Sequence, residues 1–221
     1  MLLHFIRHAE SLANIGRSSE IDCDLSDKGR TQVVAVAAEM RRLGVDHVLT
    51  SPYRRALMTG AAIANASGVP FEVHLRLHEH QIRPWPPAWP LLGRADLVRA
   101  FPGLTVPEDM VEGPDWHPAP ESDTSLLERM GAVIDGIVAR FAPSNRIALI
   151  SHGAPVGRAL QAFLGAPEVH RAEVDIGNAS ITTLEVIGAK RYVRVVNRMD
   201  HLRDVIAGVP TVMNGFGPAR L

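Results

Sequence analysis

The stretch Leu2-Leu3-His4-Phe5-Ile6-Arg7-His8 decides the fold of this 221-residue chain. A short, mostly apolar run that stops abruptly at charged and polar residues is typical of a buried strand. Similar runs occupy residues 47–50, 146–150, 180–186 and 192–196, and helical patterns separate most of them. Strands that alternate with helices predict a three-layer α/β/α fold, in which helices flank a central, mostly parallel sheet.

Residues typical of helix N-termini mark the start of several predicted helices. Ser51-Pro52 offers a capping hydroxyl followed by a proline at the first helical position. Ser125 and Glu128 have the spacing of a capping box, which predicts a long helix after Ser125. Gly153 opens a further helix directly after a strand. Two of the helices are therefore expected to begin where strands end.

One segment departs from this alternation. Residues 80–120 contain nine of the sixteen prolines and all three tryptophans. Prolines at this density exclude a central strand, and long irregular inserts in compact domains are commonly functional. We therefore predict one domain over residues 1–221, with an irregular Pro/Trp-rich lid at about 80–120. The Gly- and Pro-rich tail at 208–221 is expected to lie on the surface.

Composition narrows the class of protein. The formal net charge is −1, with 46% hydrophobic and 21% charged residues, as in ordinary globular proteins. No cationic excess is present to bind a nucleic-acid backbone, so no nucleic-acid partner is expected. Cys23 is the single cysteine, which excludes an internal disulfide framework. No apolar run has the length of a signal sequence or membrane span, so the sequence predicts a cytoplasmic protein without a membrane partner.

Cationic and imidazole side chains gather at the predicted strand ends. Arg7 and His8 end the first strand, Arg55 follows the second, and His152 follows the run at 146–150. Because ligands of open α/β sheets bind outside the carboxyl ends of the strands, these four residues are expected to converge. The helix that opens at Gly153 adds the partial positive charge of its N-terminus. Such a site favours an anion, and guanidinium groups match phosphate best.

Taken one at a time, these residues also have ordinary structural explanations. A single histidine at a strand end is more often structural than catalytic, and arginines on a helix often face solvent. The coincidence of four such groups favours the anion site, because they would repel one another without a ligand. His74, His78 and His80 also cluster in the sequence. A metal ion beside arginines is electrostatically unfavourable, so we predict surface histidines and no metal site.

Six segments follow one another along the chain: Arg7-His8-Ala9-Glu10 with Asn14, residues 24–32 (DLSDKGRTQ), residues 51–59 (SPYRRALMT), Leu77-His78-Glu79, Pro120-Glu121-Ser122 and Ser151-His152-Gly153. In this order they resemble the motifs of the histidine phosphatase superfamily, in its phosphoglycerate-mutase-like branch (branch 1). The resemblance implies a phosphohistidine intermediate on His8 and a general acid and base at Glu79. It further implies that Arg7, Arg55 and His152 hold the phosphoryl oxygens, with Asn14 as an additional donor, and that no cofactor is needed.

The resemblance leaves several functions open. A metal-independent phosphomonoester hydrolase acting on a small phosphorylated metabolite is the leading hypothesis. A mutase would return the phosphoryl group to another hydroxyl, and a binding module would not turn the ligand over. A metal-dependent hydrolase that uses the scattered histidines is a fourth hypothesis. Trp85 or Trp89 is expected to touch the organic part of the substrate. The sheet edge formed by the late strands is a candidate surface for a homodimer.

Overall fold

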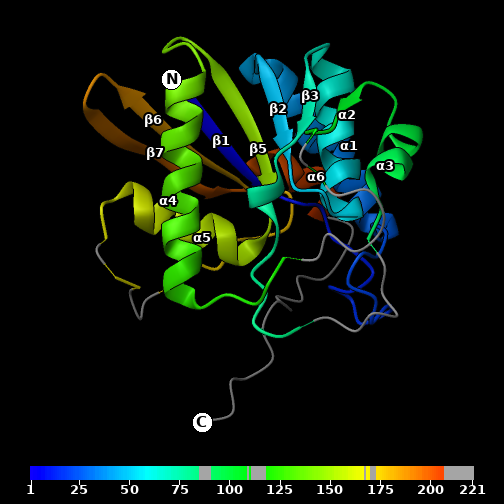
Figure 1. Cartoon of the computed structure of the whole chain (residues 1–221). Helices are drawn as coiled ribbons and strands as arrows, with labels where there is room; N and C mark the ends of the chain where they lie inside the picture. The colour runs from blue at the N-terminus through cyan, green and yellow to red at the C-terminus, as the bar shows by residue number, and fades with distance from the viewer. Residues whose placement is uncertain (85–90, 109, 111–117, 167, 170–172, 207–221) are drawn as a thin grey trace.

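The protein is built on one mixed sheet with helices on both faces (Figure 1). The computed structural model describes residues 1–84, 91–108, 110, 118–166, 168–169 and 173–206. Within these residues the sheet has seven strands in the order β4-β3-β2-β5-β1-β6-β7. Their bounds are β1 Leu2–Arg7, β2 His47–Thr50, β3 Phe71–Val73, β4 Leu104–Thr105, β5 Arg146–Ser151, β6 Ile181–Ile187 and β7 Lys190–Arg198.

The helices form the two outer layers. They are α1 Asp27–Leu43, α2 Arg54–Ser67, α3 Arg94–Ala100, α4 Asp123–Arg140, α5 Gly153–Phe163 and α6 Arg203–Ile206, with short 3-10 helices at Leu75–Leu77 and Asp200–Leu202. Helices α1 and α2 pack on the sheet face that presents Ile6 and Ile150. Helices α4 and α5 pack on the opposite face, which presents Phe5 and Leu149. Because successive strand residues point to opposite faces and both faces are covered, the central strands β1 and β5 are mostly apolar and buried, whereas the edge strand β7 is polar and largely exposed. The predicted three-layer arrangement is confirmed.

Strand pairing explains why the site lies at one edge of the sheet. Strands β4, β3, β2, β5 and β1 are parallel neighbours, whereas β6 and β7 form an antiparallel hairpin beside β1. Arg7 at the end of β1 pairs with Ser151 at the end of β5. Thr50 at the end of β2 pairs with Ile150. The carboxyl ends of these three strands therefore coincide, as the mostly parallel sheet predicted.

Two helix starts differ from the sequence prediction. Helix α4 begins at Asp123, and its cap is Ser122, whose hydroxyl accepts from the backbone N–H of Ser125. The predicted cap, Ser125, is thus inside the helix. Helix α2 begins at Arg54 with Tyr53 as its N-cap. Ser51 does not cap it, because its hydroxyl contacts His152 instead.

The segment at 80–120 is only partly irregular. Its described residues contain α3 and the two-residue strand β4, and Leu97, Leu104 and Val106 are buried in the core beside α2 and β3. Its one strand, β4, lies at the sheet edge, where flanking prolines are tolerated, so the segment contributes no central strand among its described residues, as predicted. Trp85, Trp89, Trp116 and the tail at 208–221 lie outside the described residues, so the lid stays a prediction. None of the helices in the described ranges is both long and apolar enough to cross a bilayer.

Candidate active site

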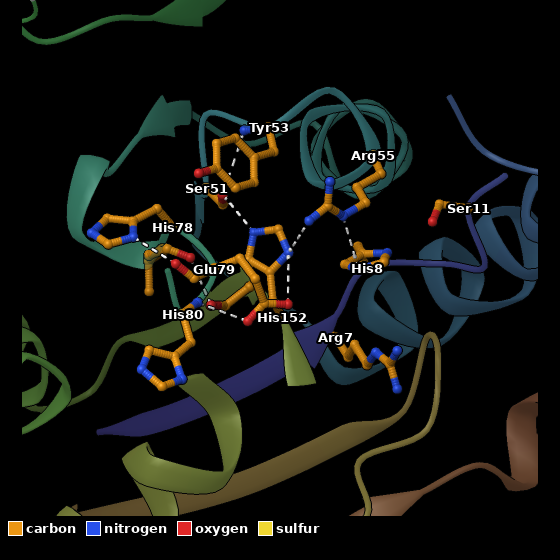
Figure 2. A network of polar contacts seen from close by, with 12 residues as sticks. Arg7, His8, Ser11, Ser51, Tyr53, Arg55, His78, Glu79, His80 and His152 are labelled. Carbon is orange, nitrogen blue, oxygen red and sulfur yellow. Dashed lines mark hydrogen bonds and ion pairs between the residues drawn. The ribbon is translucent and has the colours of Figure 1, made fainter. Parts of the chain in front are cut away.

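The four side chains predicted to converge lie together at the carboxyl edge of the sheet (Figure 2). Arg7 is the last residue of β1 and His8 follows it, while His152 follows β5 and serves as the N-cap of α5. Arg55 stands in the first turn of α2. The centroids of the His8 and His152 rings are 5.1 Å apart. Residues separated by 145 positions in the sequence thus form one compact group.

His8 is held as a neutral imidazole whose Nε2 is unprotonated. Its Nδ1 lies 2.7 Å from the carbonyl oxygen of Ala9, which only accepts, so Nδ1 carries the proton. Its Nε2 accepts from Nε of Arg55 at 3.1 Å. The ring is 2% exposed. Burial, aided by Arg55 and Arg7, holds the pKa of His8 well below its ordinary value.

Arg55 joins the two imidazole rings. While Nε donates to His8, Nη2 lies 3.2 Å from Nδ1 of His152. Nη1 donates to the carbonyl oxygen of Ile21 at 2.5 Å. The guanidinium is 7% exposed, and the described residues place no carboxylate in an ion pair with it. A buried cation whose partners are imidazoles and a carbonyl is suited to an incoming anion.

His152 is fully buried and contacts both Arg55 and Ser51. Its Nε2 lies 2.8 Å from Oγ of Ser51, and the Tyr53 ring packs edge-on at 5.2 Å. Burial, followed by the charge of Arg55, keeps the pKa of His152 well below its ordinary range. Since Nδ1 faces the donor Arg55, Nε2 carries the proton and donates to Ser51 in this state.

Arg7 supplies a second buried guanidinium. Its Nη1 donates to the carbonyl oxygen of Ile176 at 2.5 Å. Its Nε is buried, and no acceptor in the described parts of the chain reaches it. Burial lowers the pKa of Arg7, and the nearby Glu79 charge opposes that change. A Cβ added to Gly153 would lie 3.7 Å from this guanidinium, so the start of α5 borders the same space.

Glu79 approaches the group from the other side. It follows the 3-10 helix at Leu75–Leu77, and its Oε2 lies 3.7 Å from Nδ1 of His152. Its Oε1 accepts from the backbone N–H of His80 at 2.9 Å. Burial raises the pKa of Glu79, and this effect outweighs the charges of Arg55 and Arg7. The side chain is nevertheless 28% exposed, so Glu79 borders solvent.

The loop after His8 is tied down by amide groups. Oδ1 of Asn14 accepts from the Ser11 backbone N–H and hydroxyl, each at 3.0 Å, and from Nδ2 of Asn178 at 3.2 Å. The same Asn178 nitrogen donates to the His8 carbonyl oxygen at 3.1 Å. Asn14 therefore supports the loop through its oxygen, and its Nδ2 takes no part in these bonds. Asn178 was not predicted from the sequence. Trp85, the other predicted substrate contact, lies outside the described residues.

Arg129 on α4 braces the segment that carries Glu79. It is 8% exposed and donates from Nη1 to the carbonyl oxygens of Arg76 at 2.5 Å and His78 at 3.1 Å. Nε and Nη2 donate to the two carboxylate oxygens of Glu121 at 2.9 and 2.5 Å. The sequence prediction missed this residue. The available signal was an arginine beside Met130 on the buried stripe of a helix.

The clustered histidines differ from the prediction of surface residues. His78 is buried, with its Nδ1 2.8 Å from the carbonyl oxygen of Glu79. His74 and His80 are half-buried. The reason is that the segment carrying them passes between the sheet and α4, beneath Arg129. Across the described ranges, no three His, Cys, Asp or Glu side chains are grouped as a metal site requires.

Comparisons with known proteins agree with this geometry. The family model of the histidine phosphatase superfamily (branch 1) matches residues 3–199. A probable phosphoglycerate mutase, GpmB, of Yersinia pestis (strain Pestoides F) is 27% identical over 196 residues, which cover 83% of this chain and 84% of that protein.

Solved structures share the fold. A mycobacterial glucosyl-3-phosphoglycerate phosphatase in complex with VO3 has a TM-score of 0.65 and 23% identity, with 90% of this chain and 99% of that chain covered. Bacillus stearothermophilus YhfR has a TM-score of 0.69 and 22% identity, with 91% and 98% covered. Because the family model spans nearly the whole sequence, the chain belongs to the histidine phosphatase superfamily, branch 1.

Proposed function

We propose that this protein is a phosphomonoester hydrolase that forms a phosphohistidine on His8 and needs neither a metal ion nor a cofactor. The observation that carries the proposal is the hydrogen bond from Arg55 Nε to His8 Nε2, 3.1 Å long. It points the electron pair of a neutral imidazole into a space bordered by cations. A nucleophile, an anion site and a carboxyl of raised pKa are what phosphoryl transfer needs.

In the first step, Nε2 of His8 attacks phosphorus in line with the leaving oxygen. The P–N bond forms as the P–O bond to the alcohol breaks. Protonated Glu79 gives its proton to the departing alkoxide, so the alcohol leaves neutral. Before the attack, as the substrate binds, Arg55 exchanges its imidazole contacts for the phosphoryl oxygens and so frees the Nε2 electron pair, and the unpartnered Nε of Arg7 supplies another donor. The backbone N–H of Gly153 and Nδ2 of Asn14 are proposed as further donors.

In the second step, Glu79 acts as the base. Its carboxylate takes a proton from water, the water oxygen attacks phosphorus, and the P–N bond breaks. Inorganic phosphate leaves, and His8 and Glu79 return to their starting states. The partial exposure of the Glu79 side chain gives water a route to this position. That route favours hydrolysis over transfer to a second substrate hydroxyl.

The mutase remains the second candidate, because a relative named as a probable phosphoglycerate mutase covers most of the chain. Its chemistry differs only in the acceptor of the phosphoryl group. A module that binds phosphate without turnover is less well supported, because binding alone does not require a carboxyl group with a raised pKa beside the anion site. The hydrolase proposal places the substrate among small phosphorylated metabolites.

Phosphate release by the wild type and His8→Ala, in EDTA, tests the proposal. The substrates are p-nitrophenyl phosphate and a panel of sugar phosphates, phosphoglycerates and nucleotides. We expect His8→Ala to lose about 10³-fold or more in kcat. His47→Ala is the matched control, because His47 lies at the opposite end of β2. Turnover retained in His8→Ala, or abolished by EDTA in the wild type, would overturn the proposal, and interconversion of 2- and 3-phosphoglycerate without phosphate release would favour the mutase.

A further inference from the structure

A cavity of about 320 Å³ adjoins the site between α5, His80 and the loop at residues 173–176. Its lining touches the proposed catalytic groups at three points. Gly153 borders the Arg7 guanidinium, the carbonyl oxygen of Ile176 accepts from Arg7, and His80 donates its backbone N–H to Glu79. In the view of Figure 2, His80 lies on the far side of Glu79 from His8. The alcohol that leaves toward Glu79 therefore leaves toward this cavity.

The cavity is acidic, in contrast to the cationic phosphoryl site. Asp123, Glu173 and Asp175 line it together with one guanidinium, that of Arg158. Arg158 is 5% exposed, and its Nη2 is paired with Asp123 at 2.8 Å and Glu173 at 2.9 Å. Asp175 is exposed and has no ion-pair partner in the described parts of the chain. Among the described lining residues, three carboxylates against one cation leave a surplus of two negative charges.

We infer that this cavity is the subsite for the alcohol part of the phosphomonoester, and that it selects neutral or positively charged alcohols rich in hydrogen-bond donors. The inference rests on the proposed function and adds its substrate class. Carboxylates accept hydrogen bonds from hydroxyl and ammonium groups, whereas a second carboxylate or phosphate on the substrate would be repelled. The volume is at the lower end of the roughly 300–1,000 Å³ typical of small-molecule pockets. The size thus fits a small metabolite.

Two features of the cavity favour negative charge, and both are already engaged. The N-terminus of α5 lies at the end of the cavity that borders Arg7, where it would serve the phosphoryl group. Arg158 is held by two carboxylates through Nη2, which compensate its charge, while its buried Nε has no partner in the described residues. Asp175 and Glu173 present carboxylate oxygens to the cavity as acceptors, and the charge of Asp175 also acts on Arg7. The substrate is thereby divided into an anionic end and a donor-rich end.

A matched pair of substrates tests this division. Glycerol 3-phosphate and 3-phosphoglycerate differ only in a CH₂OH group that replaces a carboxylate. We expect the wild type to prefer glycerol 3-phosphate in kcat/KM by roughly tenfold or more at low ionic strength. Salt should reduce the preference, because it screens the carboxylates. If p-nitrophenyl phosphate is the faster substrate, the inhibition constants of the pair against its hydrolysis provide the same ratio.

Substitutions then locate the source of the preference. Asp175→Asn should reduce the kcat/KM ratio of glycerol 3-phosphate to 3-phosphoglycerate by about threefold or more. Glu173→Gln should also reduce this ratio, while Asp123 still pairs with Arg158. Asp135→Asn is the control, because it removes one negative charge from α4 about 18 Å along the helix from Asp123. It should leave the ratio unchanged.

The outcomes separate the subsite from the chemistry. Equal or better use of 3-phosphoglycerate by the wild type, or a ratio unmoved by both Asp175→Asn and Glu173→Gln, would overturn the subsite and leave the hydrolase standing. Absence of His8-dependent turnover with every ester would instead overturn the proposed function. In that case the two compounds are compared by their protection against thermal unfolding, where stronger protection by 3-phosphoglycerate also refutes the subsite.

Discussion

Ser51 Oγ lies 2.8 Å from Nε2 of His152, inside the buried centre of the site. A hydroxyl both donates and accepts, so this contact suits either neutral tautomer of the ring. Without ligand, Nδ1 accepts from Arg55 and Nε2 donates to Ser51. When Arg55 turns to a phosphoryl group, Ser51 can donate to Nε2 and leave the Nδ1 proton for a phosphoryl oxygen. We therefore expect Ser51 to position the His152 ring when a phosphoryl group binds.

Ser51→Ala should lower kcat/KM by about 5–30-fold, which corresponds to about 1–2 kcal/mol for the lost partner of a buried ring. It should also alter the pH profile, because the proton distribution on His152 changes. Steady-state kinetics from pH 4.5 to 8 measure both effects. Ser180→Ala is the control, because the Ser180 hydroxyl is buried without a partner in the described residues. Unchanged kinetics in Ser51→Ala would remove this role.

The convergence of Arg7, His8, Arg55 and His152 was predictable from the sequence, because each follows an apolar run and parallel strands end at one edge. The role of Ser51 was not, because its partner lies 101 residues away and a serine before a proline is typical of a helix cap. Strand β3 was missed for a related reason: three residues carry too little periodicity. Side-chain roles and short strands that depend on contacts between distant segments cannot be derived from local sequence patterns.

Glu79→Gln should reduce turnover most for esters with poor leaving groups. Alkyl phosphates need a proton on the departing oxygen. Loss of the proton donor should therefore lower kcat/KM for these esters by about 10²–10⁴-fold. p-Nitrophenolate leaves without a proton, so the loss for that ester should be much smaller in the first step. Glu72→Gln on β3 serves as the control, because Glu72 pairs with Arg140 on the surface. Equal losses of kcat/KM, which reports the first step, for both esters would exclude Glu79 as the general acid.

The pH dependence of kcat/KM should have opposing limbs. The lowered pKa of His8 keeps its ring neutral and nucleophilic into the acidic range. The raised pKa of Glu79 keeps its carboxyl protonated to higher pH than an ordinary carboxyl. Activity should therefore rise with pH as His8 loses its proton and fall as Glu79 loses its own. Glu79→Gln should abolish the alkaline limb, and an unchanged limb would assign it to another group.

Arg129 is expected to act on catalysis through Glu79, since it holds the backbone carbonyls on both sides of Leu77, just before Glu79. Arg129→Met leaves Glu121 and two carbonyl oxygens unpaired, which should cost about 3–5 kcal/mol in the free energy of unfolding. In the folded variant, kcat should fall more for alkyl phosphates than for p-nitrophenyl phosphate, the same signature as Glu79→Gln. Arg140→Met, on the same helix, should have neither effect. Arg129→Lys keeps the charge and tests the role if Arg129→Met does not fold.

His4 should make the fold sensitive to acid. It is 2% exposed, its Nδ1 contacts the Thr183 hydroxyl at 3.0 Å, and its Nε2 has no partner in the described residues. Burial, with the charges of Arg198 and Arg146, lowers its pKa to about 4. Between pH 6.5 and about 4 the unfolded chain therefore binds a proton that the folded chain does not. The contribution of His4 to the free energy of unfolding is fully present above pH 6.5. It is lost as the pH falls toward 4, and the loss amounts to up to about 3 kcal/mol.

Urea unfolding at pH 7.5, 6.0 and 5.0 measures this contribution. His4→Leu should reduce the slope of unfolding free energy against pH by up to one proton, about 1.4 kcal/mol per pH unit. A residual slope should persist, because burial also lowers the pKa values of His8, His78 and His152. His47→Gln on β2, which β5 separates from β1, should retain the wild-type slope. An identical slope in His4→Leu would mean that His4 accepts its proton within the folded protein, which requires water or a carboxylate to reach Nε2.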